Sequence, residues 1–293
     1  MKASLRIAGV IAVCLAGPGA LVVTADNPQY AFSSVDAPAE LGAFTSVYGN
    51  NNAGVLVGNF VTADGSLDGF IVQKGIFADV IVPGAASESR GALNDVNDLG
   101  QAVGGFVDDT GIEHSFVRSK GGEITLLPDV PDAVLTEATS INNQGDIVGF
   151  YLDAGFAPHG FILRDGVYTT VDYPGSTRTI LTRINERGQI TGIRRDPDGH
   201  RRGFVLEHGV ATTIDVPGSR NTRTHGINNQ GHVVGYYDDA DLISHGFLLK
   251  NGVYMTLDFP AASDTALLDI NDRGEIAGTY DGFTRGLVAI PVK

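Results

Sequence analysis

The chain has 293 residues, of which 43% are apolar and 18% are charged, and its formal net charge is −14. This composition is that of a soluble globular protein, and its strong negative charge argues against nucleic acid or anionic membrane surfaces as partners. A single cysteine, Cys14, excludes a disulfide within the chain, and the lack of tryptophan excludes the usual indole platform for sugars.

The N-terminal segment differs from the rest of the chain. Lys2 and Arg6 precede a ten-residue apolar run, and small residues follow as far as Ala25. This arrangement is typical of a secretory signal peptide, and the apolar run is too short to cross a bilayer. We therefore expect residues 1–25 to be a signal peptide that is cleaved near Ala25 and takes Cys14 with it. The mature protein would be secreted or periplasmic, without membrane insertion.

From residue 30 onward the sequence repeats one pattern six times. A unit reads Ile-Asn-x-x-Gly-x-Ile-Val-Gly, then a short acidic loop, His-Gly-Phe, and finally Tyr-Thr-Thr-Ile-Asp-x-Pro-Gly. The first glycine of the unit recurs every 43 to 46 residues, at Gly54, Gly100, Gly145, Gly188, Gly231 and Gly274. A period of this length indicates a repeat architecture rather than several unrelated domains.

Each unit contains four short strand patterns separated by tight turns. In the third unit the strands are expected at residues 136–142, 146–151, 159–163 and 167–172, with Asn-x-x-Gly and Asp-Gly at turns. Strands that are apolar on both faces must be covered on both sides by neighbouring units. Four-stranded units of this length that stack radially form the blades of a β-propeller.

The two ends of the chain indicate a closed ring. The sixth unit stops after its third strand, and the missing fourth strand occurs at residues 32–38, which match residues 168–174. An open solenoid, the alternative, would need capping units instead of such a strand. We predict an all-β fold, a single six-bladed β-propeller domain of four-stranded blades over residues 26–293. The N-terminal strand would complete the last blade.

These units resemble the bacterial extracellular repeats of the HAF family. The resemblance lies in the Ile-Asn-x-x-Gly-x-Ile-Val-Gly segments and in the His-Gly-Phe segments that begin at His159 and His245, and it extends over residues 30–290. It implies secretion and repeated β structure but no shared activity. Other residues replace the histidine in the remaining units, which rules out a function that needs six equivalent histidines.

Standard catalytic, metal and phosphate-binding motifs do not occur in the sequence. Aspartates recur in the Asp-x-Pro-Gly turns and in the loops between the second and third strands, where we expect each to accept hydrogen bonds from its own turn. The segment Asp196-Pro-Asp-Gly is similar to half of a calcium loop, but it lacks the downstream bidentate glutamate. We expect no resident metal or cofactor, with calcium as the weaker alternative.

Arginines gather in the fourth unit. Nine of the 20 basic residues lie between positions 178 and 223, and on a propeller most of them fall on one face. The guanidinium fork suits carboxylate, sulfate or phosphate, whereas local pairing with the abundant acids is the alternative interpretation. We predict an anion site with ligand-binding residues Arg183, Arg194, Arg202, Arg223, Tyr48 and Asp95.

The residues just before each Ile-Asn pair differ from unit to unit and would lie near the central axis. Among them Glu137, His225 and Asp269 are candidates for a general acid or base, although a solvated channel lining is the simpler interpretation. The sequence thus predicts a monomeric binding protein for an anionic small molecule or an acidic glycan. Two alternatives remain: an extracellular hydrolase or lyase acting on an anionic sugar, and an envelope scaffold for protein partners.

Overall fold

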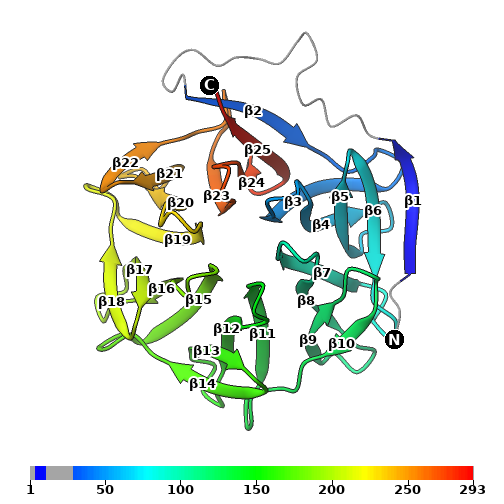
Figure 1. The fold of residues 1–293 in the computed structure, drawn as a ribbon, viewed down its shortest axis with the longest axis horizontal. Coiled ribbons are helices and arrows are strands. Elements are labelled where there is room, and N and C mark those ends of the chain that lie inside the picture. Colours follow the sequence, from blue (N-terminus) through cyan, green and yellow to red (C-terminus); the bar gives the residue numbers. More distant parts are fainter. Residues whose placement is uncertain (1–3, 11–28, 293) are drawn as a thin grey trace.

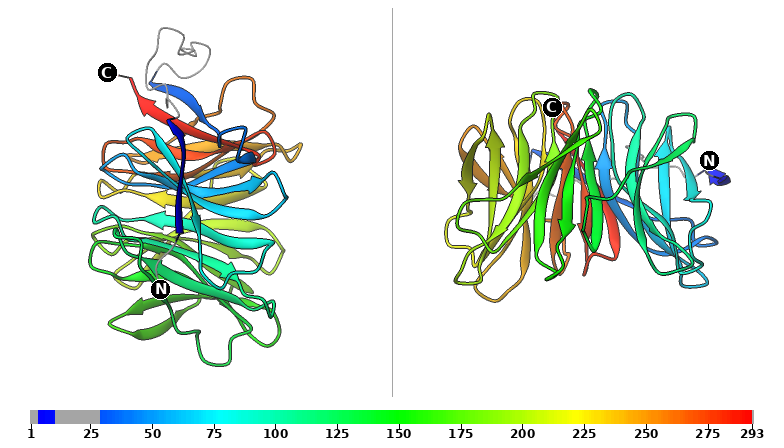
Figure 2. Two further views of the ribbon diagram at one scale, coloured as in Figure 1. Left: turned by 90° about the vertical axis from the view of Figure 1, so that its right-hand side faces the viewer. Right: turned by 90° about the horizontal axis from the view of Figure 1, so that it is seen from below.

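The predicted propeller is confirmed by the fold. The computed structural model describes residues 4–10 and 29–292, in which all regular secondary structure is β. Six four-stranded antiparallel blades lie around a central axis (Figure 1), and the side views show that they form one ring-shaped layer (Figure 2). No helix in the described residues is long and apolar enough to cross a membrane.

The strands of each blade follow one another from the axis outward. The strands of the first three blades are β3 (Gly42–Asn50), β4 (Leu56–Thr62), β5 (Leu67–Gln73) and β6 (Ile76–Ile81); β7 (Ser89–Val96), β8 (Ala102–Val107), β9 (Glu113–Arg118) and β10 (Ile124–Leu126); and β11 (Leu135–Ile141), β12 (Ile147–Leu152), β13 (Pro158–Arg164) and β14 (Val167–Val171). Those of the fourth and fifth blades are β15 (Arg178–Ile184), β16 (Ile190–Arg195), β17 (Arg201–Glu207) and β18 (Val210–Ile214); and β19 (Asn221–Ile227), β20 (Val233–Asp238), β21 (Ser244–Lys250) and β22 (Val253–Thr256).

The sixth blade combines the two ends of the chain. It consists of β23 (Thr265–Ile270), β24 (Ile276–Tyr280), β25 (Arg285–Pro291) and β2 (Tyr30–Val35). β2 pairs antiparallel with β25, from Tyr30 opposite Pro291 to Val35 opposite Gly286. The strand that the sequence assigned to the last blade therefore occupies that place.

A further strand, β1 (Ser4–Val10), lies antiparallel to β6 at the outer edge of the first blade. Within residues 4–10 and 29–292, the outer strands β10, β14, β18 and β22 have no such additional neighbour. The first blade thus has its four strands without β1. The rest of the expected signal peptide lies outside the described residues, and its cleavage stays a prediction.

One glycine of the second strand and one large apolar residue of the third, phenylalanine in five blades and leucine in the sixth, explain how the blades pack. Phe161 on the third strand is fully buried, and its ring lies against Gly149 on the second strand. A Cβ atom on Gly149 would come within 2.8 Å of the Phe161 ring and within 1.9 Å of the Glu137 carbonyl oxygen. The position of Phe161 is occupied in the other blades by Phe70, Phe116, Phe204, Phe247 and Leu287, all of which are buried. The second-strand glycine and the large apolar residue opposite it thus recur in all six blades because each blade packs in the same way.

The asparagine of the Ile-Asn pair joins neighbouring blades. Its side-chain amide donates to the backbone carbonyl of the equivalent asparagine in the next blade, from Asn51 to Asn97, Asn97 to Asn142, Asn185 to Asn228, Asn228 to Asn271 and Asn271 to Asn51. The following residues form a complete second ring of backbone N–H to side-chain oxygen bonds, through Asn52, Asp98, Asn143, Glu186, Asn229 and Asp272. We call the face that carries these rings the lower face. The upper face carries the turns between the second and third strands.

Candidate functional site

A β-bulge in the innermost strand of every blade directs one side chain toward the axis. The pairing register with the second strand shifts at this point in all six blades. The side chains at the shifts are Tyr48, Asn94, Thr139, Thr182, His225 and Leu268, and all of them line one cavity of about 230 Å³. Bulges redirect side chains in this way beside functional sites. The repeat therefore presents six positions with five residue types to one space.

The wall of this cavity above the bulges also differs from blade to blade. Glu137 on β11 lies opposite Phe150 on β12, and Ile180 on β15 lies opposite Ile193 on β16. All four residues line the cavity. The equivalent pairs in the other blades are Ser46 with Asn59, Ala92 with Gly105, Arg223 with Tyr236 and Ala266 with Thr279. The repeat is thus regular where blades pack and irregular where they face the cavity.

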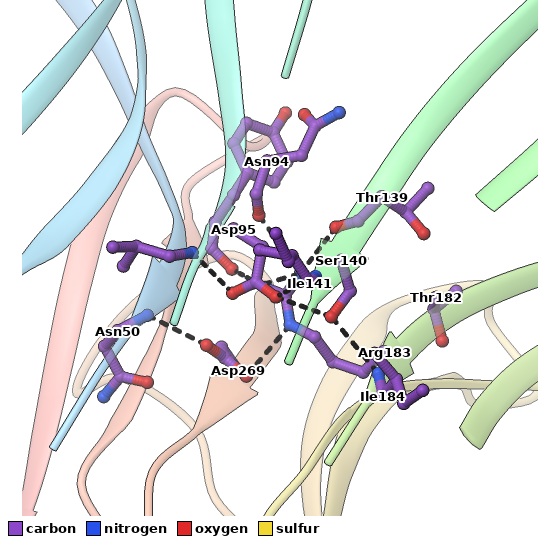
Figure 3. A network of polar contacts seen from close by, with 12 residues as sticks. Asn50, Asn94, Asp95, Thr139, Ser140, Ile141, Thr182, Arg183, Ile184 and Asp269 are labelled. Atoms are coloured by element: carbon purple, nitrogen blue, oxygen red, sulfur yellow. Dashed lines mark hydrogen bonds and ion pairs between the residues drawn. The ribbon is translucent and has the colours of Figure 1, made fainter. Parts of the chain in front are cut away.

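Arg183 lies at the centre of a network of polar contacts near the axis (Figure 3) and lines the cavity. It extends from the fourth blade across the axis, is only 6% exposed, and lines both this cavity and a space of about 70 Å³ at the lower face. Its Nε donates to Asp269 Oδ1 at 3.0 Å, and its Nη1 donates to the carbonyl oxygens of Asn94 at 3.1 Å and Thr139 at 2.9 Å. Nη2 donates to the Tyr48 carbonyl oxygen. The arginine joins five blades at the axis.

Asp95 and Asp269 belong to the same polar network and line the space at the lower face. Asp95 accepts hydrogen bonds from Ser140 Oγ at 2.5 Å and from the Ile141 backbone N–H at 3.1 Å. Asp269 accepts one from Arg183 and, at 2.8 Å, one from the backbone N–H of Asn50. Burial raises the pKa of Asp269 against the opposing pull of Arg183. The sequence predicts that Arg183 and Asp95 bind a ligand and that Asp269 transfers protons. In the structure, Arg183 instead forms ion pairs with both aspartates across the axis.

Arg202 lies outside the cavity in a contact that other blades make with histidine. His245 Nδ1 is 2.7 Å from Asp258 in the turn after its blade, and Arg202 Nε is 3.1 Å from Asp215 in the equivalent turn. Each of these pairs ties the third strand of a blade to the connection that follows the fourth strand. Arg202, which the sequence predicts to bind a ligand, thus has a structural contact instead. The repeated aspartates of these turns, Asp215 and Asp258, are partners in such contacts.

Two further arginines from the expected anion site also have acidic partners. Arg194 pairs with Asp196 at the upper end of the fourth blade. Arg223 forms a bidentate pair with Asp238 at 2.9 and 3.0 Å, and its guanidinium lies 4.8 Å from the centre of the Tyr236 ring. Of the four arginines expected to hold an anion, none is without a carboxylate partner.

Three other arginines of the fourth blade form no ion pair with any described residue, although Arg195 Nε donates to the Gly199 carbonyl oxygen at 3.1 Å. Arg178 lies opposite Arg195, and Arg195 lies opposite Arg201, so their side chains share one face of the fourth blade. On the same face, two residues further down the strands, Ile180 and Ile193 line the cavity. Among the described residues, no carboxylate lies within ion-pair distance of these three arginines, and all three are exposed. Like charges opposite each other destabilise a sheet, so these three arginines repel one another.

The sequence placed these arginines in the basic fourth unit but could not separate them from the paired ones. The strand register supplies that distinction.

At the lower face, acidic residues alternate with asparagines in the second ring, yet among residues 4–10 and 29–292 no group of three His, Cys, Asp or Glu side chains is arranged to hold a metal ion. Asp196 of the expected half calcium loop is bound by Arg194.

Glu137 is the acidic group of the cavity. Burial and, next, repulsion by Glu113 raise its pKa to about 7, while a weak hydrogen bond from Asn94 Nδ2 at 3.4 Å opposes this rise. A carboxyl group with this pKa is half protonated at neutral pH, so it can both donate and accept a hydrogen bond or a proton.

His225 is a neutral counterpart in the same cavity. Burial, followed by the charges of Arg183 and Arg223, lowers its pKa to about 3, so the imidazole stays uncharged at physiological pH. Its Nε2 is buried and has no hydrogen-bond partner within the described protein, and its ring stacks on Tyr236 with centroids 5.4 Å apart. A buried polar atom without a partner is costly.

A second and larger hollow lies between the third and fourth blades, away from the axis. It has a volume of about 660 Å³ and is lined largely by apolar side chains, among them Ile162, Tyr173 and Leu206. Its lining includes Asp172 but no basic group. It therefore lacks the polar convergence found in the axial cavity.

Comparisons with known proteins identify the fold but not a family. No family model and no curated protein matches the chain. Among solved structures, the chain is similar to a streptogramin B lyase, with 13% identity over 90% of this chain and 98% of the other and a TM-score of 0.55. It is also similar to the six-bladed fucose-recognising lectin of Aleuria aurantia, with 12% identity over 85% and 92% and a TM-score of 0.52. A putative TolB from Agrobacterium tumefaciens matches with 12% identity over 81% and 91% and a TM-score of 0.53. At these identities the likeness concerns the fold alone.

Proposed function

We propose that the protein is a binding protein that holds a small organic anion in the axial cavity. The observation that carries this proposal is the contrast between regular packing positions and irregular cavity-lining positions in one and the same repeat. Residues that only maintain the ring have no reason to differ between blades. Propellers serve binding, catalysis and scaffolding alike, so the site and not the fold has to make the argument.

The chemistry of the cavity supports a ligand with an apolar body and few polar groups. Phe150, Ile180, Ile193 and Leu268 form apolar walls, while Tyr48, Asn94, Glu137 and His225 offer hydrogen bonds. Small-molecule sites combine these features in this proportion. The anionic group would point upward to Arg178, Arg195 and Arg201. A uronic acid, as in an acidic glycan, and an aromatic carboxylate both meet this description.

Isothermal calorimetry on residues 26–293 tests the proposal with matched pairs of ligands, galacturonate against galactose and benzoate against benzyl alcohol. The acid of at least one pair is expected to bind. Its neutral partner should have an affinity at least about tenfold lower, because one charge-assisted hydrogen bond is worth about 1.5–3 kcal/mol. The Arg178→Ala/Arg195→Ala variant should lose that preference. Arg187→Ala, on the lower face, is the matched control. Equal binding of acid and neutral partners, or no effect of the double variant, would refute the anionic ligand.

Turnover of the bound molecule, as by a hydrolase or lyase on an anionic sugar, is a second candidate. The observation that favours it is the pKa of Glu137, which lies near neutral pH where a general acid or base works best. Heat that continues after mixing, together with new signals in the NMR spectrum of an oligogalacturonate, would indicate turnover. Glu137→Gln should then abolish it. A stable spectrum over hours would leave the binding function alone.

We further propose that the protein is secreted or periplasmic, acts as a monomer, and is related to the HAF repeat proteins. The leader-like residues 1–25 and the repeated units support the first and last points. Expression in a bacterial host with a secretory pathway, followed by N-terminal sequencing and light scattering, tests location and mass. An N-terminus at Asp26 is expected. Retention of the complete chain in the cytoplasm would contradict secretion.

A further inference from the structure

The turn between β24 and β25 has an unusual backbone. Asp281, Gly282 and Phe283 have positive φ values of 52°, 71° and 63° in succession. The corresponding turns of the other blades have a single residue with positive φ, which is a glycine in the first, second and fourth blades (Gly65, Gly111 and Gly199) and Phe156 or Leu242 in the third and fifth. Because the Cβ atom makes this region unfavourable, a bulky residue such as phenylalanine is rarely found there.

Hydrogen bonds from two blades hold this turn in place. The carboxylate of Asp264 accepts the Gly282 backbone N–H at 2.8 and 3.0 Å. Thr284 Oγ1 donates to the Asp281 carbonyl oxygen at 2.6 Å, and Ser46 Oγ of the first blade donates to the Phe283 carbonyl oxygen at 3.0 Å. Strained backbone persists only where its surroundings fix it, and it collects at ligand clamps and active sites.

The strained turn presents an exposed aromatic ring beside the cavity. Phe283 is 43% exposed, and its ring meets Tyr236 edge-on with centroids 5.6 Å apart. Tyr236 in turn stacks on His225, which lines the cavity. An aromatic column therefore leads from the upper face into the proposed site. Phe156 and Leu242 occupy the equivalent turns of the third and fifth blades, so Phe283 is distinguished by its contact with Tyr236 and by the three successive positive φ values of its turn.

We propose that the turn over residues 281–283 is a lip of the axial site and that Phe283 is a specificity-determining residue that contacts the part of the ligand projecting from the cavity. The inference rests on the proposed function, because it assigns a further contact to the same site. It narrows the ligand class to organic anions with an apolar ring or hydrocarbon segment outside the part that the cavity encloses. The three unpaired arginines and Phe283 would then select together for charge and apolar surface.

Fluorescence titration with anilinonaphthalene sulfonate, an aromatic anion whose emission rises in apolar contact, tests this lip. Residues 26–293 are compared with Phe283→Gly and Asp264→Ala, which remove the ring and its support. His208→Gly is the matched control, since His208 also has a positive φ but lies in the turn between β17 and β18. Thermal unfolding of every variant shows that it is folded.

We expect one equivalent of the probe to bind, and Phe283→Gly to weaken its affinity about fivefold, the value of one lost aromatic contact. His208→Gly should bind as the parent protein does. Asp264→Ala should lower the affinity for the probe as well. If that variant unfolds, Phe283→Gly alone decides the outcome. No binding to the parent protein, or an affinity of Phe283→Gly within about twofold of it, overturns the lip.

The same titration separates the two proposals. If probe binding depends on Phe283 but neither benzoate nor Arg178→Ala/Arg195→Ala affects it, the proposed axial anion site fails, and Phe283 is then an apolar contact that does not belong to that site. If benzoate binds and depends on the arginines, while Phe283→Gly leaves the probe unchanged, only the lip fails.

Discussion

Replacing Glu137 with glutamine is expected to stabilise the protein at pH 8 and to change its stability little at pH 4. In the folded protein the pKa of this carboxyl group is raised to about 7 from the ordinary value of 4.5. Between these two pH values the unfolded chain releases a proton that the folded protein retains. The free energy of unfolding therefore falls as the pH rises through this window. Glutamine cannot ionise and escapes this loss.

The size of the effect follows from the shift. Each pKa unit corresponds to about 1.4 kcal/mol, so the full shift amounts to an upper limit of about 3 kcal/mol at pH 8. Urea unfolding of residues 26–293 at pH 4, 6 and 8 measures it for the parent protein, for Glu137→Gln, and for Glu40→Gln at an exposed position. An equal difference between parent and Glu137→Gln at pH 4 and pH 8 would show that Glu137 is not a buried acid.

Three further predictions concern the ring itself. Phe161→Ala should lower the free energy of unfolding by about 3–5 kcal/mol in urea, because it empties a fully buried position, whereas Val167→Ala at an exposed position should change it by about 0.5 kcal/mol or less. Burial lowers the pKa of His245, but its contacts with Asp258 and Asp239 outweigh this and raise it. The stabilisation from this histidine should be present below about pH 6.5 and lost as the pH rises through the raised value, so His245→Asn should lower Tm more at pH 5 than at pH 8.5; equal losses would contradict the pairing. Removal of residues 1–25 should leave Tm unchanged in a thermal melt, since the first blade keeps four strands without β1, and a clear drop would mean that β1 belongs to the folded domain.

The fold could be predicted from the sequence because every blade meets the same packing problem. Gly149 and Phe161 recur at a fixed spacing since a side chain on the second strand would collide with the phenylalanine of the third. Asn228 recurs because its amide reaches the next blade. The missing strand of the last blade was visible for the same reason, as a pattern at residues 32–38 that fitted nowhere else.

The site could be predicted only in part. Glu137 and His225 were recognised as cavity candidates, because they interrupt the repeat near the axis. The role of Arg183 depends on a contact with Asp269, which is 86 residues away in the sequence, and no local pattern reveals that contact. The bulge that turns His225 toward the axis is likewise a matter of strand register, which one extra residue sets. The separation of paired from unpaired arginines needed the same register.

The central claim, that the blade-specific axial cavity is the ligand site, is tested most directly by crystal structures of residues 26–293 soaked with galacturonate and with benzoate. The account predicts density for at least one of them in the axial cavity, near His225 and Glu137, with the carboxylate toward Arg178 and Arg195. Density in the hollow between the third and fourth blades instead, or an axial cavity that stays free of both acids at saturating concentration, would contradict it.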